Sequence, residues 1–144
     1  GTYGVLALII YFLLLYSLLT VMALPFVCLV ILAADPLCKF IGSLITLILP
    51  YARTAETSKS KVVYNKMSAK PFIVSAIFGL LPAILLLNVW YWLAVLFPLA
   101  IFAILVSLMK RKIQGYTGDC CGALFLLSEL AFYLGIVALT NIMI

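Results

Sequence analysis

The stretch from Pro71 to Met109 contains no charged residue and consists almost wholly of apolar side chains. It is too long to cross a membrane only once, because about 20 apolar residues already span a hydrocarbon core of roughly 30 Å. Inside it, the sequence LNVWYW at Leu87–Trp92 offers an asparagine for a turn and aromatic residues that favour a membrane interface. We therefore predict two membrane-spanning helices, near residues 71–88 and 90–109.

Three further apolar segments are long enough to span a membrane, near residues 4–23, 26–50 and 119–142. The first two form one run whose break we place at Ala23–Pro25, since proline is tolerated in the first turn of a helix. Hydrophobic residues make up 68% of the chain and charged residues 9%, against about a quarter charged in soluble domains. The sequence predicts an all-α fold, a polytopic transmembrane helical bundle of about five spans, and excludes a soluble globular protein. We expect contacts with membrane lipid and no nucleic-acid partner, and we leave the oligomeric state open.

The chain opens with GTYGVLALII, without an initiator methionine, a basic segment or a small-residue cleavage site. A secretory signal peptide carries a basic segment and a cleavage site around its apolar run. We therefore expect the first apolar run to be a genuine span and the natural protein to begin before Gly1.

Four cysteines lie in or beside apolar segments, and the sequence contains no histidine that would complete a mixed zinc site. Unpaired cysteine commonly behaves as a small buried hydrophobic side chain. We expect that role, rather than a disulfide or a metal site, for Cys28, Cys38, Cys120 and Cys121.

Two polar segments connect the spans, residues 51–70 with five Lys/Arg and one acid, and residues 110–118 with three Lys/Arg. With five spans both segments emerge on the same side of the membrane, and basic loops face the cytoplasm. We expect a multi-pass protein of the cell inner membrane whose N-terminus, both loops and active face are cytoplasmic. The lysines of the first loop are interpreted as topology determinants and contacts to anionic lipid; they are Lys59, Lys61, Lys66 and Lys70.

Apart from Asp119 at the edge of the last span, three charged residues lie inside the predicted spans. Asp35 and Lys39 are four residues apart, so they share one helix face in the order that favours an ion pair. We weigh two roles for them equally, a self-neutralising structural pair and the lining of a polar cavity. Glu129 lies about 15 Å along the last helix and is a functional candidate as an intramembrane ionisable group. Its carboxyl is either protonated and hydrogen-bonded to a neighbouring helix or paired with a cation, and we expect it to hold the bundle together.

The sequence QGYTGDCCG, at Gln114–Gly122, precedes the last span. Its glycines free the backbone for a tight turn, Thr117 is able to cap the helix, and Asp119 lies at the helix mouth, where the helix dipole favours an anion. Arg53, just after Tyr51, offers a guanidinium that binds phosphate in a bidentate manner. The substrate-binding candidates are Arg53, Lys110, Arg111, Gly115, Thr117 and Gly118, with Asp119 as the catalytic candidate.

The segment LMKRKIQGYTGDCCGALFLLSELAFYLG resembles the C-terminal signature of the cobalamin synthase family, the adenosylcobinamide-GDP ribazoletransferases. The opening GTYGVLALI, the basic Lys39 and the sequence Tyr-Ala-Arg at Tyr51–Arg53 resemble the family in the same order, so the resemblance covers nearly the whole chain. Gln114 replaces the first glycine of the family pattern. The residues that match the pattern are Gly115, Thr117, Gly118, Asp119, Gly122, Ala123 and Glu129.

The resemblance implies the last steps of cobalamin biosynthesis, in which phosphocobinamide passes from adenosylcobinamide-GDP to α-ribazole or its 5′-phosphate and GMP is released. It also implies Mg²⁺, held mainly by an upstream motif of the form Asp-Gly-x-Ala-Asp-x-x-Asp-Gly that this sequence lacks. We therefore interpret residues 1–144 as the C-terminal membrane portion of such an enzyme, inactive alone and with no metal ligand of its own assigned.

Within that reaction, Arg53, Lys110 and Arg111 would supply cations to the diphosphate, and Asp119 would orient the nucleophile or complete the metal site. The alternative interpretation is a small multispan transporter or channel subunit. In that case the residues that line its polar path would be Asp35, Lys39 and Glu129.

Overall fold

The computed structural model describes residues 1–52 and 67–143, and within these ranges every regular element is a helix. The long helices follow from runs of apolar residues whose backbone polar groups are satisfied within the helix, as a membrane requires. The elements in chain order are α1 (Thr2–Thr20), α2 (Leu24–Ser43), α3 (Ile45–Ile48), α4 (Ala69–Leu86), the 3-10 helix η1 (Val89–Val95), α5 (Leu96–Ile113) and α6 (Gly118–Met143).

In the part of the chain that the structure describes, five helical segments are long and apolar enough to cross a membrane, which confirms the predicted multi-pass all-α bundle. The predicted breaks also hold: α2 begins at Leu24 with Pro25 in its first turn, and the Asn88 side chain accepts a hydrogen bond from the Trp90 N–H at 3.4 Å. The spans are Thr2–Thr20, Leu24–Ile48, Ala69–Leu86, Val89–Ile113 and Gly118–Ile142.

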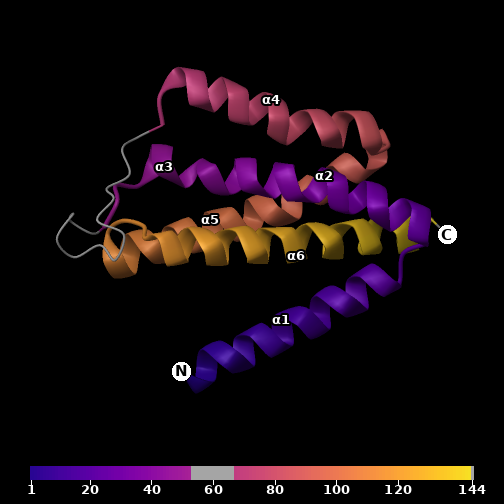
Figure 1. Ribbon diagram of the computed structural model, residues 1–144, viewed down its shortest axis with the longest axis horizontal. Helices are drawn as coiled ribbons and strands as arrows, with labels where there is room; N and C mark the ends of the chain where they lie inside the picture. Colours follow the sequence, from indigo (N-terminus) through magenta and orange to yellow (C-terminus); the bar gives the residue numbers. More distant parts are fainter. Residues whose placement is uncertain (53–66, 144) are drawn as a thin grey trace.

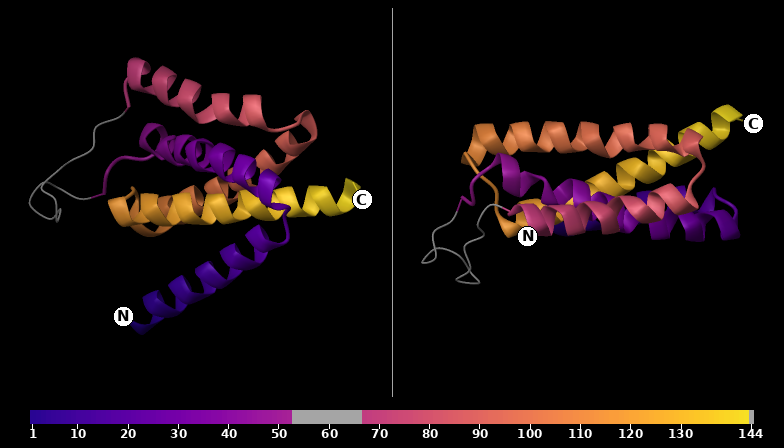
Figure 2. Two further views of the ribbon diagram at one scale, coloured as in Figure 1. Left: turned by 45° about the vertical axis from the view of Figure 1, so that its right-hand side comes forward. Right: turned by 90° about the horizontal axis from the view of Figure 1, so that it is seen from above.

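The bundle has one end at which α3 and α5 finish and α4 and α6 begin, here called the loop end (Figure 1). The N-terminus of α1 lies toward the same end. In Figure 1 and in the left view of Figure 2, α1 approaches the other helices near its own C-terminus and diverges from them toward its N-terminus. The remaining helices lie close together, with α2 packed against both α4 and α6.

The core forms where α2 and α6 meet, around Leu37, Phe132, Tyr133 and Ile136. A second, smaller core closes the loop end. Helix α1 contributes no buried residue. Of the cysteines, Cys38 is buried and two are partly buried, but Cys28 is exposed on α2, so its predicted burial was wrong. A thiol is apolar enough to face lipid from that surface.

Close packing of α2 on α4 depends on Gly79. A Cβ at this position would lie 2.4 Å from Phe40 Cβ and 3.1 Å from the Pro36 carbonyl oxygen. The carbonyl oxygen is a backbone atom and the Phe40 Cβ is bonded to the backbone, so neither moves aside without displacing helix α2. Small residues commonly allow such close helix contacts in membranes.

We expect Gly79→Ala to lower the free energy of unfolding in detergent by about 1–2 kcal/mol, the cost of overpacking less the helix propensity that alanine gains. Gly42→Ala is the matched control, because a Cβ there meets no atom within 4 Å. The control should unfold at the same or a higher denaturant concentration than the parent. Equal effects of the two substitutions would contradict this packing.

Candidate functional site

Two segments far apart in the sequence pair at the loop end. The Ala52 N–H donates to the Tyr116 carbonyl at 2.9 Å, and the Tyr116 N–H donates to the Pro50 carbonyl at 3.0 Å. The rings of Tyr51 and Tyr116 meet edge to face, with their centroids 5.4 Å apart. This pairing, here called the Tyr51–Tyr116 bridge, fixes the chain after α3 against the turn that opens α6.

Gly115 allows this bridge to form. A Cβ at Gly115 would lie 2.7 Å from the Pro50 carbonyl oxygen and 2.9 Å from Ala52 Cβ. The sequence predicts Gly115 as a flexible turn residue, but the structure shows that it is needed for close approach of two backbones.

The left-handed residue of the turn is instead Gln114, the C-cap of α5, with φ 52° and ψ 25°. This is the position at which Gln114 replaces a glycine of the family pattern. Glycine at a helix C-terminus adopts the left-handed conformation without the penalty of roughly 1–2 kcal/mol that a Cβ brings. Gln114 therefore carries some backbone strain, and the bridge at the next two residues helps to hold it.

Thr117 caps α6 as predicted. Its Oγ1 accepts a hydrogen bond from the Cys120 N–H at 3.4 Å, and its carbonyl accepts one from the Cys121 N–H at 3.1 Å. Gly118 is already the first residue of α6 and has no positive φ. The prediction that Gly118 gives the backbone freedom for a tight turn was therefore wrong. The space beside this glycine is open, since a Cβ there meets no atom within 4 Å.

Asp119 lies exposed in the first turn of α6. The exposed Lys110 and Arg111 lie in the last turn of α5, where cations favour the helix dipole. The loop is thus shorter than the predicted range 110–118, because α5 continues to Ile113 and these cations belong to the helix. Among the described residues no ion pair joins them to Asp119. The third predicted cation, Arg53, lies outside the described residues.

Asp35 and Lys39 form the predicted ion pair on α2, with Lys39 Nζ 2.8 Å from Asp35 Oδ1. The side chains are 45% and 61% exposed, respectively. Lys39 Nζ also lies 5.4 Å from the centroid of the Phe125 ring of α6, a cation–π distance. The pair therefore faces α6 while remaining open on its other side.

Glu129 is half-buried in α6 and is held by the phenol of Tyr133. The Tyr133 hydroxyl, four residues further along the same helix, donates to Glu129 Oε1 at 2.7 Å. Among the described residues this bond lies within α6, and no cation pairs with Glu129, so neither predicted arrangement is confirmed. Tyr11 of α1 lies close enough to this carboxyl to feel its charge.

We expect Glu129→Ala to cost roughly 1–3 kcal/mol of stability, because the Tyr133 hydroxyl, itself buried, would lose its acceptor. Glu129→Gln keeps an acceptor oxygen of the same reach and should be mild. Thermal unfolding of the two variants in the same detergent compares them directly. Equal destabilisation by both substitutions would show that the charge, and not the hydrogen bond, is what matters.

A comparison with known families identifies the chain. The model of the family described as cobalamin-5-phosphate synthase matches residues 1–137. The chain belongs to this family. The matches support the cobalamin synthase interpretation, and the transporter or channel interpretation has no support from them.

Curated relatives named adenosylcobinamide-GDP ribazoletransferase extend the similarity across nearly the whole chain. The protein from Shewanella pealeana is 34% identical over 96% of the chain, that from Shewanella baltica is 29% identical over 99%, and that from Leptospira interrogans is 33% identical over 72%. The chain covers 55%, 56% and 41% of these relatives, respectively, so it spans about half their length. No solved structure matches the chain.

The sequence interpretation missed two features of this candidate site. It gave no role to Tyr116 or Pro50, which build the bridge. It also gave none to Tyr133, which donates a hydrogen bond to Glu129, or to Tyr11 near the same carboxyl. The only signal for the second pair was the four-residue spacing of Glu129 and Tyr133 on one helix face.

Proposed function

We propose that a protein of the relatives' length that contains this chain, here called the family-length protein, is an adenosylcobinamide-GDP ribazoletransferase. It transfers phosphocobinamide from adenosylcobinamide-GDP to α-ribazole or its 5′-phosphate and releases GMP. Membership of the cobalamin-5-phosphate synthase family supports this reaction class. The structural observation that carries the site assignment is the Tyr51–Tyr116 bridge, which joins the residues just before Arg53 to the turn just before Asp119.

The reaction makes one P–O bond and breaks another. The acceptor hydroxyl oxygen attacks the phosphorus that carries cobinamide, the bridging P–O bond of the diphosphate breaks, and GMP leaves with the bonding electrons. Asp119 takes or orients the hydroxyl proton, because it is an exposed carboxylate at the mouth of α6. Lys110 and Arg111, with Arg53, stabilise the charge on the diphosphate and on the departing GMP.

Mg²⁺ stays an expectation for the family-length protein. A hard divalent cation needs several oxygen ligands, and within residues 1–52 and 67–143 no group of three or more acidic, cysteine or histidine residues is placed to hold a metal ion. The described residues alone therefore do not fit a complete Mg²⁺ site, and the step above assigns no role to the metal.

The orientation belongs to the same proposal: the loop end faces the cytoplasm of a cell with an inner membrane. Two groups of basic residues in the sequence support this orientation. Lys110, Arg111 and Lys112 belong to the described helix α5, and the lysines of residues 53–66 lie outside the described residues. A cysteine placed at Ser58 should react with an impermeant reagent only when the cytoplasmic side is accessible. Labelling from the periplasmic side of intact cells would contradict this orientation.

The function is tested with the family-length protein in membrane vesicles. We expect GMP to be released from adenosylcobinamide-GDP only when α-ribazole or its 5′-phosphate is added, with a matching amount of the corrinoid product. GMP release at the same rate without either acceptor would indicate a hydrolase and would reject the transferase.

A further inference from the structure

One face of α6 carries an unusual row of residues from the loop end to the middle of the span. Gly118, Gly122, Phe125, Glu129 and Tyr133 are separated by four, three, four and four positions, the spacing that places side chains on one helix face. The row joins the proposed reaction site near Asp119 to the intramembrane carboxyl. About 16 Å of helix separates its first residue from Glu129.

The row is open near the loop end. A Cβ at Gly118 or at Gly122 would meet no atom within 4 Å, and both residues are exposed, as is Asp119. Helix α1 diverges from α6 toward this end (Figures 1 and 2). Deeper in the span the face closes, because Tyr133 is 1% exposed.

Charged groups from α2 form one side of the open face. Lys39 stands over Phe125, and the Lys39–Asp35 pair is about half exposed. Hydrocarbon is a poor cover for such groups: a single charge at the centre of a membrane span costs roughly 2.5–3.5 kcal/mol even by the lower estimates, and pairing lowers this cost without removing it. A polar environment is therefore required beside this part of α2 and α6.

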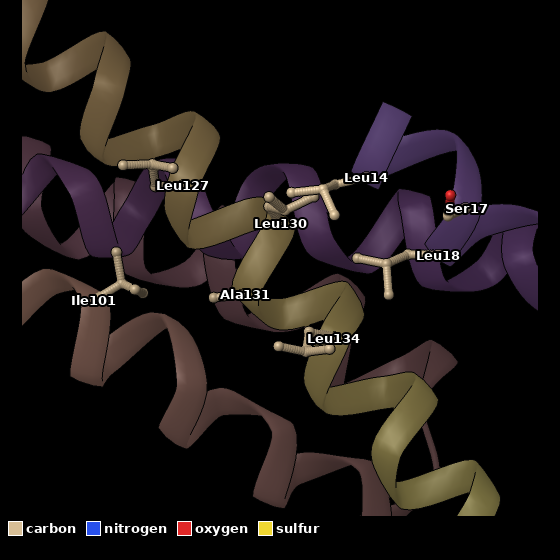
Figure 3. Close-up of a pocket in the computed structure, with 8 residues that line it drawn as sticks. All are labelled: Leu14, Ser17, Leu18, Ile101, Leu127, Leu130, Ala131 and Leu134. Atoms are coloured by element: carbon tan, nitrogen blue, oxygen red, sulfur yellow. The ribbon is translucent and has the colours of Figure 1, made fainter. Parts of the chain in front are cut away.

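The opposite side of α6 is lined by apolar side chains, in contrast to the face that carries the glycines. There α1, α5 and α6 surround a cavity of about 280 Å³, and Figure 3 shows Leu127, Leu130 and Leu134 of α6 across from Leu14 and Leu18 of α1. The only hydroxyl in its lining, that of Ser17, donates to the Leu13 carbonyl at 2.8 Å. This side suits hydrocarbon, so the polar requirement is specific to the face with the glycines.

We propose that the face of α6 from Gly118 to Glu129, with Asp35 and Lys39 of α2 and Tyr11 of α1, lines a hydrated crevice that opens at the loop end and binds the uncharged acceptor, α-ribazole. The identity of the ligand rests on the proposed function. Lys39 is already neutralised by Asp35, and Glu129 adds a further acid, so the crevice offers no excess of cations to a diphosphate. Carboxylates and phenols instead suit the hydroxyl groups of a riboside, while Lys110 and Arg111 keep the diphosphate at the mouth.

The crevice is tested by cysteine labelling of the family-length protein in membranes with a charged, membrane-impermeant thiol reagent. Gly122→Cys and Phe125→Cys place thiols in the crevice; Leu127→Cys, on the apolar side of the same helix, and the exposed Ile77→Cys on α4 are the matched controls. Peptide mass spectrometry assigns each labelled site, so the native cysteines remain in place.

We expect the crevice thiols to react about 10-fold faster or more than the controls, because hydrocarbon disfavours both the charged reagent and the thiolate that reacts. Added α-ribazole should slow labelling at Phe125→Cys several-fold, and GMP should not. Equal rates at Phe125→Cys and Leu127→Cys, or uniformly slow labelling caused by a protein cover, would overturn the hydrated crevice. Protection by GMP alone, or by neither compound, would overturn the ligand assignment. Absence of GMP release from the parent protein would reject the proposed function while leaving the labelling pattern intact.

Discussion

Replacing Gly115 with alanine is expected to lower the rate of ribazole transfer by about 10- to 100-fold, because small displacements of a catalytic group cost rates of that order. The added Cβ cannot fit 2.7 Å from the Pro50 carbonyl oxygen. The Tyr51–Tyr116 bridge must then open or shift, and the residues on its two sides lose their fixed relation. The bridge also packs Tyr116 into the small core of the loop end, so some loss of stability should accompany the loss of rate.

Gly42→Ala is the control for this substitution as well. It adds the same methyl group at a position where the new Cβ meets no atom within 4 Å beyond its own stretch of helix, so transfer should proceed at the parent rate. Rates are compared at a temperature at which both variants are fully folded, which separates positioning from unfolding. A Gly115→Ala protein with the parent rate would show that the bridge is not needed for catalysis.

The five spans could be predicted from the sequence because membrane insertion depends on length and composition, which are local. The break before Pro25 and the turn at Asn88 are local too, and both are present in the structure. The helix end at Ile113 was placed too early, because Lys110, Arg111 and Lys112 suggested a loop. Basic residues are equally suited to the last turn of a helix, and the structure places them there.

The site was predictable only in part. Thr117 as a cap and the Asp35–Lys39 pair follow from spacing along one helix, and the structure contains both. The bridge between residues 50–52 and 115–116 depends on how α3 and α5 finish side by side, so no local pattern reveals it. The approach of Tyr11 to Glu129 is equally hidden, because these residues belong to the first and the last helix.

Asp119→Asn should reduce transfer by at least about 100-fold, the lower end of what a positioned acid or base contributes. The change removes the negative charge and the ability to take a proton but keeps nearly the same shape. The fold should survive, because Thr117 caps α6 and because Asp119 is exposed. Any loss of helix stability from the weaker dipole interaction should stay within about 1 kcal/mol.

The central claim is that the mouth of α6 is where phosphocobinamide is transferred. The most direct measurement is α-ribazole-dependent GMP release by the family-length protein and its Asp119→Asn variant, at equal membrane content and with thermal unfolding followed in parallel. The account predicts that the variant unfolds within a few degrees of the parent and releases almost no GMP. A variant that unfolds normally and releases GMP at close to the parent rate would leave Asp119 with no catalytic role and would contradict the claim.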